Sequence, residues 1–375
     1  MMPGQITYLD NNATAPLRPE VVHAMTEALH THGNASSIHS LGRQTRSRIE
    51  AARNEIANLV GVKADEVIFT SGGTEANNLA LRGVSNARVL ISAIEHESVL
   101  RAAPADSRFI PVLPSGIIDL AALDAMLGDA ETPALISVML ANNETGIVQP
   151  VAQAANIAHS HGALLHCDAV QAAGKIAVDC SELGADLLTL SAHKFGGPQG
   201  VGALIVRNGL EITSQMRGGG QERGRRGGTE NVAAIVGFAA ASVLAKDALP
   251  SLAMEMSSLR DRLEDGVQTI TPHAVFFGCG QQRLPNTSCF ALAGVAAATQ
   301  VMNLDLAGVA ISAGAACSSG KVARSAVLSA MGIDDELSGA AIRVSLGWAT
   351  KSADIDAFLA AWEMIAGRIK LRQAS

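Results

Sequence analysis

The sequence predicts an α/β protein whose larger part is a mainly parallel sheet with helices on both faces. Between Asp65 and about Arg207, short and almost wholly apolar runs alternate with helical stretches. Near-continuous apolar strands are typical of parallel sheets that are buried on both faces. The 375 residues are enough for two domains, and because 48% of them are hydrophobic, the chain can form a large core.

The elements of this first region follow one another in a regular order. We expect strands at Glu66–Thr70, Arg88–Ala93, Ala134–Leu140, Ala163–Asp168, Asp186–Ser191 and Gly202–Val206, and helices at Thr74–Arg82 and Val151–His161. In sheets of this kind the chemistry takes place at the carboxyl ends of the strands. The residues that follow each strand are therefore the candidates for a functional site.

The remainder of the chain predicts a smaller α+β domain. The Gly/Arg-rich stretch Arg217–Gly228 is expected to be a loop. After it we expect a helix from Asn231, a second helix at Leu252–Val267, strands at Ala274–Phe277, Thr287–Leu292 and Ala341–Ser345, and a final helix at Ser352–Arg372. We expect residues 12–248 to form the large domain, and residues 1–11 and 249–375 the small one.

Composition excludes several classes of function. The net charge of −7 argues against a general nucleic-acid-binding protein. The most apolar long stretch, Asn231–Leu249, is interrupted by Lys246 and Asp247, so we expect no membrane-spanning segment. The N-terminus lacks the basic and apolar regions of a secretory signal. The expected compartment is the cytoplasm.

The five cysteines favour reduced thiols. They stand at positions 167, 180, 279, 289 and 317. Their odd number, their wide spacing and the lack of a Cys-x-x-Cys pair argue against a disulfide framework and against a structural zinc site. We therefore expect no metal, and we expect most of these cysteines to be small, inert core residues.

Polar residues follow several of the expected strands. A glycine turn that opens a helix is expected at Ser71-Gly72-Gly73-Thr74. The free N–H groups at the start of that helix can bind an anion, although an ordinary capped turn has the same sequence pattern. His96 follows the next strand and is either a catalytic group or an ordinary polar residue. Asn142 begins a turn of the form Asn-Asn-Glu-Thr-Gly.

Asp168 and Lys194 follow two successive strands, 26 residues apart. A carboxylate at the end of a buried strand is costly unless a positive group meets it. Pyridoxal 5′-phosphate (PLP) needs both residue types, because a lysine forms its Schiff base and a carboxylate keeps its pyridine nitrogen protonated. The turn at Gly73-Thr74 supplies the phosphate site that this cofactor also needs.

These motifs, in this order, resemble a known family. Tyr8-Leu-Asp-Asn-Asn-Ala-Thr14, Ser71-Gly-Gly-Thr-Glu-Ala-Asn-Asn78, Asn142-Asn-Glu-Thr-Gly146, Asp168-Ala-Val-Gln171, Ser191-Ala-His-Lys194 and Gly314-Ala-Ala-Cys-Ser-Ser-Gly320 span nearly the whole chain. The set is similar to the cysteine desulfurases of the NifS/IscS-like group within the class V aminotransferases. This resemblance implies the fold of the aspartate aminotransferase-like PLP-dependent transferases, fold type I.

The resemblance also implies residue roles. Lys194 would carry the cofactor, Asp168 would pair with its pyridine nitrogen, and His96 would stack on its ring and assist proton transfer. The other implied cofactor contacts are Gly73, Thr74, Asn142, Gln171, Ser191 and His193, with Thr229 reaching the phosphate from the second subunit of a homodimer. Asn142 and Arg343 would contact the substrate, Arg343 by gripping its carboxylate.

The reaction implied by the resemblance converts L-cysteine to L-alanine and leaves its sulfur as a persulfide on the enzyme. Cys317 is the expected acceptor, because it stands in a run of small residues, within a loop at about 312–325, that has neither strand nor helix periodicity. The sulfur would then pass to a further acceptor, such as an iron–sulfur scaffold protein.

The sequence also departs from the family pattern. It has Ala315 where Gly-Ser-Ala-Cys is common, Ala35 where Gly-Asn-Pro-Ser-Ser is common, and Lys321-Val-Ala-Arg-Ser325 in place of a Leu-Glu-Pro-Ser stretch. A selenocysteine lyase or another class V aminotransferase-type enzyme would have the same fold. An RNA-binding arm at Arg217–Gly228 and a catalytically silent scaffold are further readings, which the net charge and the full set of catalytic residue types oppose.

Overall fold

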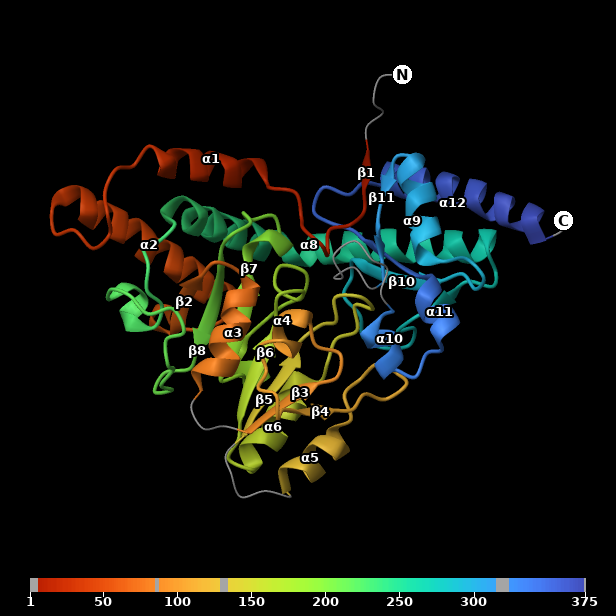
Figure 1. The fold of residues 1–375 in the computed structure, drawn as a ribbon. Coiled ribbons are helices and arrows are strands. Elements are labelled where there is room, and N and C mark those ends of the chain that lie inside the picture. The colour runs from red at the N-terminus through yellow and green to blue at the C-terminus, as the bar shows by residue number, and fades with distance from the viewer. Residues whose placement is uncertain (1–5, 85–87, 129–133, 315–323, 374–375) are drawn as a thin grey trace.

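A seven-stranded sheet forms the centre of the larger part of the molecule (Figure 1). The structure is a computed structural model, and it describes residues 6–84, 88–128, 134–314 and 324–373. Its strands are β2 (Val67–Thr70), β3 (Arg88–Ser92), β4 (Arg108–Ile110), β5 (Ala134–Met139), β6 (Leu164–Asp168), β7 (Leu187–Ser191) and β8 (Gly202–Val206). Their order is β2-β8-β7-β6-β5-β3-β4, and β8 is antiparallel to both of its neighbours. The pairs from β7 through β4 are all parallel, so the mainly parallel sheet is confirmed.

Helices cover both faces of this sheet because successive side chains of the strands point in opposite directions. Ile136 and Leu188 pack with α2 (Ser40–Leu59), α6 (Val151–Ser160) and the first half of α8 (Val232–Ile270). Leu135 and Leu187 pack on the other face with α3 (Gly73–Gly83) and α4 (Glu97–Leu100). The remaining helices of this part are α1 (Pro19–Leu29), α5 (Leu120–Gly128) and α7 (Cys180–Leu183).

One long helix, α8, stands where the sequence predicts two. It runs without a break through Pro250, and the predicted domain boundary at residue 248 falls inside it (Figure 1). A proline removes one helical hydrogen bond, but packing on both sides of it compensates. The first half of α8 packs against α1 and α2, and the second half packs against α12 (Ser352–Gln373). The helix therefore joins the two parts of the molecule.

By length and composition, α8 is the only helix in the described ranges that is long and apolar enough to cross a membrane. Close to half of its most apolar stretch is buried inside the protein. Ala234, Ile235 and Phe238 of α8 lie in the core of the larger part, and Met256, Leu259 and Leu263 lie in the core of the smaller part, so packing accounts for the apolar character of this helix.

The smaller part contains a four-stranded antiparallel sheet and an aromatic core. The sheet has the order β12 (Ser312–Ala313), β13 (Ala341–Ser345), β10 (Thr287–Ala291) and β9 (Val275–Phe276). Phe290 of β10 packs against Trp362 of α12 with ring centroids 5.4 Å apart. A two-stranded parallel sheet pairs β1 (Thr7–Tyr8) with β11 (Val309–Ala310), so the N-terminal strand packs with the C-terminal elements. The other helices here are α9 (Ala297–Leu306), α10 (Ala326–Ala330) and α11 (Asp335–Ala340).

The Gly/Arg-rich stretch is an irregular segment with one short 3₁₀ helix, Gln221–Gly224, and is anchored by a buried ion pair. Both oxygens of the Glu222 carboxylate accept hydrogen bonds from the Arg53 guanidinium, at 2.7 and 2.9 Å, and Phe69 N–H donates to Oε2 at 2.9 Å. Glu222 has a φ of 46°, a left-handed conformation that is uncommon for a residue with a side chain. The bidentate pair thus holds the segment in place against local strain.

Replacing Glu222 by Gln should lower the free energy of unfolding by about 3–5 kcal/mol, because Arg53 would lose its buried bidentate counter-charge and keep only the half-exposed Glu50, 3.3 Å away. Urea unfolding monitored by circular dichroism measures this loss. Glu97→Gln is the matched control, since Glu97 pairs with Arg101 on the exposed surface and should contribute less than about 1 kcal/mol. Equal stability of both variants would contradict the anchoring role of Glu222.

His166 lies in β6, fully buried between two hydroxyl groups. Its Nδ1 lies 2.8 Å from Ser137 Oγ and its Nε2 lies 3.0 Å from Thr189 Oγ1. Burial lowers the pKa of His166 to about 4, against the small opposing effect of the Asp168 charge. The unfolded chain therefore takes up a proton at this residue, near pH 6.5, before the folded protein does.

The stability that His166 contributes should be complete above pH 6.5 and should be lost as the pH falls from 6.5 to about 4. The loss should reach up to about 3 kcal/mol, because each unit of pKa difference corresponds to about 1.4 kcal/mol. The measurement is the free energy of unfolding of the wild type minus that of His166→Asn between pH 4 and 7. A difference that does not change with pH would contradict this assignment.

Candidate active site

A cavity of about 270 Å³ opens at the carboxyl ends of β5, β6 and β7, next to the start of α3. The parallel register brings Asp168 of β6 level with Thr189 of β7, so the residues that end these strands meet at one edge. The cavity is lined by Gly73, Thr74, Asn77, His96, Ser98, Met139, Ala141, Asn143, Asp168, Val170, Gln171, Ser191, His193 and Lys194. Most of the residues that the sequence singles out are brought together here.

Asp168 is held rigidly at the floor of this cavity. Asn77 Nδ2 donates to its Oδ2 at 2.8 Å, and the N–H of Val170 donates to its Oδ1 at 2.9 Å. Burial and the charge on Asp168 raise the pKa of the neighbouring Glu95 well above its usual range.

The start of α3 offers its backbone to the cavity. Gly73 and Thr74 both line it, and they belong to the first turn, whose N–H groups have no partner within the helix. A side chain at Gly202 would stand 2.7 Å from the carbonyl carbon of Gly72, so glycine is needed at position 202 for β8 to approach this turn. Ser191 and His193 line the same region, which can therefore bind an anionic group.

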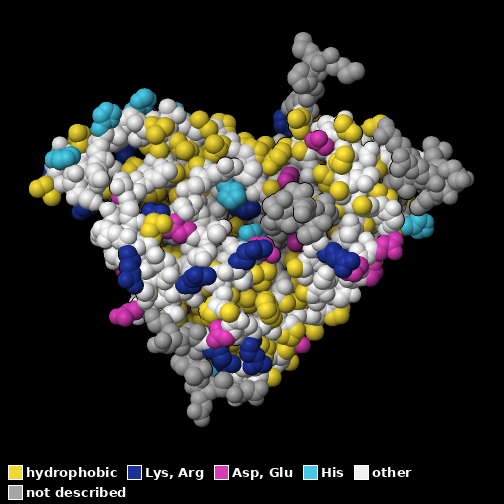
Figure 2. All heavy atoms as spheres, in the orientation of Figure 1, with side chains coloured by type: hydrophobic (Ala, Val, Ile, Leu, Met, Phe, Trp, Pro, Cys, Tyr) yellow, Lys and Arg dark blue, Asp and Glu magenta, His cyan; other side chains and the backbone are white. Residues whose placement is uncertain are grey.

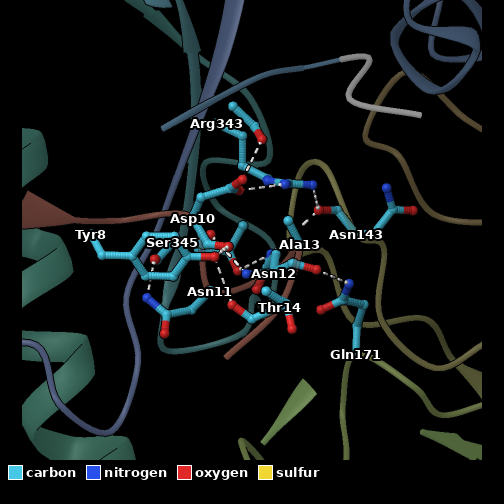
Figure 3. Close-up of polar contacts among 12 residues, drawn as sticks. Tyr8, Asp10, Asn11, Asn12, Ala13, Thr14, Asn143, Gln171, Arg343 and Ser345 are labelled. Carbon is cyan, nitrogen blue, oxygen red and sulfur yellow. Dashed lines mark hydrogen bonds and ion pairs between the residues drawn. The ribbon is translucent and has the colours of Figure 1, made fainter. Parts of the chain in front are cut away.

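Lys194 reaches the segment formed by residues 10–14, which we call the N-terminal strap. Its Nζ donates to the backbone oxygens of Asn12 at 2.6 Å and Ala13 at 3.0 Å. The Asn12 oxygen also accepts from Gln171 Nε2 at 3.0 Å. Figure 3 shows the strap between Arg343 on one side and Gln171 on the other. The strap thus ties the small part of the molecule to the cavity wall.

Lys175, which the sequence analysis missed, is a buried part of this network. Its Nζ donates to Gln171 Oε1 at 2.7 Å and to Asn12 Oδ1 at 2.8 Å. Burial lowers the pKa of Lys175 well below its usual range, and the charges on Lys194 and Arg343 lower it further. Because Lys175 binds the oxygen of the Gln171 amide, the nitrogen of that amide is oriented to donate to the backbone oxygen of Asn12. A lysine in the apolar run Ala172–Val178, four residues after Gln171, is the signal that identifies it.

Asn143, and not Asn142, presents its side chain to the cavity. Asn142 Oδ1 accepts from the N–H groups of Glu144 and Thr145, and its Nδ2 donates to the oxygen of Ile94 at 3.1 Å. The Asn142 side chain thus holds the turn together, away from the cavity lining. Asn143 is adjacent in the chain and lines the cavity. The geometry therefore corrects the predicted contact by one position.

Arg343 lies in β13 with a buried guanidinium. Its Nη2 pairs with Asp10 Oδ1 at 2.8 Å, and its Nη1 donates to the Asn143 oxygen at 3.0 Å (Figure 3). Its Nε is buried and finds no hydrogen-bond partner among the described residues. The guanidinium thus lies beside the Asn143 turn with one donor unused, as expected of a group that receives a carboxylate.

The two histidines of the site have lowered pKa values. His96 Nδ1 contacts Ser98 Oγ at 2.8 Å and accepts from the Ser98 N–H at 3.1 Å at the start of α4. Burial lowers the pKa of His96, with a further contribution from Lys194 that the Asp168 charge opposes. Burial and the charges of Lys194 and Lys175 lower the pKa of His193 to about 4. Both imidazoles are therefore neutral at pH 7, and because His96 Nδ1 accepts from the Ser98 N–H, the proton of this neutral ring lies on Nε2.

Three predicted residues among the described ones are absent from the lining of this cavity: Asn142, Thr229 and Arg343. Thr229 is exposed, and the fourth predicted residue, Cys317, lies outside the described residues. Cys167, Cys180 and Cys289 are free and buried, and burial raises the pKa of the Cys180 thiol to about 12. Cys279 contradicts the expectation of a buried cysteine, because it is exposed in the turn between two glycines that follows β9. No group of three or more His, Cys, Asp or Glu residues in the described ranges is placed to hold a metal ion.

Comparison with known proteins identifies the family. Residues 7–358 match the class-V aminotransferase family. The chain belongs to that family. It is 44% identical to a cysteine desulfurase of Cereibacter sphaeroides over 94% of this chain and 93% of that protein. This class-V aminotransferase also has the fold of a NifS-like protein from Rickettsia africae, with a TM-score of 0.90, 36% identity and 96% and 99% of the two chains covered.

A third similar protein is SspA, whose structure was determined in complex with cysteine. It matches this class-V aminotransferase with a TM-score of 0.76 and 29% identity, over 90% of this chain and 98% of that one. The family depends on PLP, and its members have fold type I, so the predicted fold class is confirmed.

Replacing Asn142 and Asn143 separately tests the one-residue correction. In this class-V aminotransferase, Asn142→Ala should lower the free energy of unfolding by about 1–3 kcal/mol, because it leaves buried N–H groups without an acceptor. Asn143→Ala should leave stability unchanged and raise the KM for substrate. Thermal unfolding and steady-state kinetics measure the two effects. The opposite pattern, with an unstable Asn143→Ala, would restore Asn142 as the ligand-facing residue.

Proposed function

We propose that this class-V aminotransferase is a PLP-dependent cysteine desulfurase that converts L-cysteine to L-alanine and receives the sulfur on Cys317. The observation that carries the proposal is the cavity, where Lys194, Asp168 and the start of α3 meet. The cysteine desulfurases among its relatives, and the relative that binds cysteine, support the choice of substrate.

The residues of the cavity fit PLP. Asp168 is a buried carboxylate fixed by two donors, as required beside a pyridine nitrogen that stays protonated. The first turn of α3, with Thr74, Ser191 and His193, would hold the phosphate. Lys194 is a primary amine at the same cavity and would carry the cofactor. Once bound, PLP supplies an electron sink for the carbon atoms of the substrate.

The substrate is positioned by groups on the opposite side of the strap. Arg343 would bind the carboxylate of L-cysteine, using the fork that now contacts Asp10 and the Asn143 turn. Asn143 and Gln171 line the cavity on the other side of the strap and would contact the bound cofactor and substrate there. His96, neutral at pH 7 with its proton on Nε2, would donate that proton and take it back beside the cavity floor.

The sulfur step uses the thiolate of Cys317 as the nucleophile. It attacks the substrate sulfur, a sulfur–sulfur bond forms, and the carbon–sulfur bond of the substrate breaks with its electron pair moving to carbon. A proton then replaces sulfur on that carbon and gives alanine. Cysteine and an enzyme thiol become alanine and an enzyme persulfide, so no external oxidant or reductant is needed.

A homodimer would complete the site. The surface carries exposed apolar side chains along α1 and the chain that follows it, and Figure 2 shows hydrophobic side chains gathered over α1 along the upper edge of this face. Leu29 and Ile38 are 69% and 90% exposed. Thr229 is exposed and outside its own cavity, as expected of a residue that reaches the phosphate in the partner subunit.

The persulfide would pass to an acceptor protein, such as an iron–sulfur scaffold. We place the reaction in the cytoplasm, where thiols are kept reduced. The four cysteines among the described residues are free, in agreement with such a compartment.

The test compares Cys317→Ser with Cys279→Ser in the PLP-loaded enzyme. Cys317→Ser should keep the visible absorbance of bound PLP and lose both alanine formation from cysteine and the protein persulfide. Cys279→Ser removes an exposed cysteine outside the cavity and should retain both activities. Mass spectrometry detects the persulfide, and amino-acid analysis detects alanine. Unchanged alanine formation by Cys317→Ser would overturn the proposal and favour a lyase or transaminase with the same fold.

A further inference from the structure

The segment that carries Cys317 is attached to the rest of the protein by two described ends. The first end is β12, which pairs with β13 so that Ser312 stands opposite Arg343 and the N–H of Gly314 donates to the Ala341 oxygen at 2.8 Å. The second end is Ser325, which is fully buried and caps α10 through the N–H of Leu328 at 3.0 Å. Any constraint on these two residues is a constraint on how the segment between them starts and ends.

Each end is bound by a carboxylate from the active site. At the first end, Ser312 Oγ donates to Asp10 Oδ2 at 2.8 Å, while Oδ1 of the same carboxylate binds Arg343. At the second end, Ser325 Oγ donates to Oε2 of Glu144. Glu144 directly follows Asn143, whose backbone oxygen binds the other terminal nitrogen of Arg343. Both contacts therefore converge on the arginine proposed to bind the substrate.

The contact between Glu144 and Ser325 requires a carboxylate to be buried, which costs free energy of hydration. Glu144 is buried, and burial raises its pKa to about 7. The Ser325 hydroxyl and the charge on Arg343 lower this pKa and so stabilise the ionised form. A glutamine would accept the same hydrogen bond without the cost of burying a charge. Glu144 thus accepts the hydrogen bond of Ser325 at a place where the charge of Arg343 also acts on it.

We propose that Asp10 and Glu144 are positioning residues for sulfur transfer, because through Ser312 and Ser325 they fix both ends of the Cys317 segment relative to Arg343. The inference rests on the proposed desulfurase activity and adds a role for these two carboxylates. Arg343 positions the substrate, and the contacts of Asp10 with Ser312 and of Glu144 with Ser325 position the two ends of the Cys317 segment relative to Arg343. A misplacement of about 1 Å between reacting groups can lower a rate by about 100-fold.

The experiment separates substrate binding from sulfur transfer in the PLP-loaded enzyme. Glu144→Ala removes one contact and Ser312→Ala removes the other. Titration with cysteine, followed by the absorbance of bound PLP, should give the wild-type affinity for both variants. Single-turnover formation of the persulfide on Cys317 should be slowed at least about tenfold, since only the nucleophile is misplaced.

Two further variants distinguish positioning from simple loss of packing. Glu144→Gln keeps an acceptor for Ser325 and should restore most of the sulfur-transfer rate. Ser338→Ala is the matched control, because the buried Ser338 hydroxyl has no hydrogen-bond partner among the described residues, and it should behave as the wild type. Hydrogen exchange in the peptide that spans residues 324–330 should be faster in Glu144→Ala than in Glu144→Gln.

The outcomes are distinct. If the wild type forms no persulfide, the proposed function fails and the inference fails with it. If the wild type forms it and Glu144→Ala and Ser312→Ala transfer sulfur at the wild-type rate, only the inference is overturned. Weakened cysteine binding in parallel with slower transfer would also overturn it, because the two contacts would then act on Arg343 alone.

Discussion

The N-terminal strap, residues 10–14, makes the contacts on which the arrangement of the active site depends. Three nitrogen side chains, those of Lys175, Lys194 and Arg343, enter the site from different directions, and each would be costly to bury without a hydrogen-bond partner. The strap supplies those partners: Asp10 binds Arg343, the side chain of Asn12 binds Lys175, and the backbone oxygens of Asn12 and Ala13 bind Lys194. A short peptide therefore satisfies groups that are far apart in the sequence.

The strap also connects the two parts of the protein. Asn12 Nδ2 donates to Thr287 Oγ1 at 2.9 Å, and Asn286 Nδ2 donates to Asn12 Oδ1 at 3.1 Å, both from the small part. The same residue binds Gln171 and Lys175 in the large part. A movement of one part against the other would break several buried hydrogen bonds at once. The cavity and Arg343 thus keep a fixed relation in this state.

The sequence was most informative where burial imposes a simple pattern. Six of the seven strands of the large sheet are buried on both faces, so their runs are mostly apolar, and their ends lie within one residue of those predicted. The edge strand β4 was not predicted, because Arg108 and Phe109 are exposed and break that pattern. Pro250 led to two helices where packing maintains one. Local preference was overruled by tertiary contacts in these two cases.

For the active site, the chain predicts residue types better than the direction of individual side chains. Asn142 and Asn143 stand in one turn, and only the hydrogen bonds of that turn decide which amide faces the cavity. Lys175 has a function only through Asn12 and Gln171, whose contacts no local pattern contains.

The ion pair between Arg343 and Asp10 bears on how a substrate carboxylate would bind. The counter-charge of Arg343 in this structure is Asp10, which also holds Ser312. A substrate carboxylate bound by Arg343, as proposed, would bring a second negative charge to the same guanidinium, whose buried Nε has no hydrogen-bond partner among the described residues. Arg343 can therefore serve the substrate and the strap together, which leaves the contact between Asp10 and Ser312 in place.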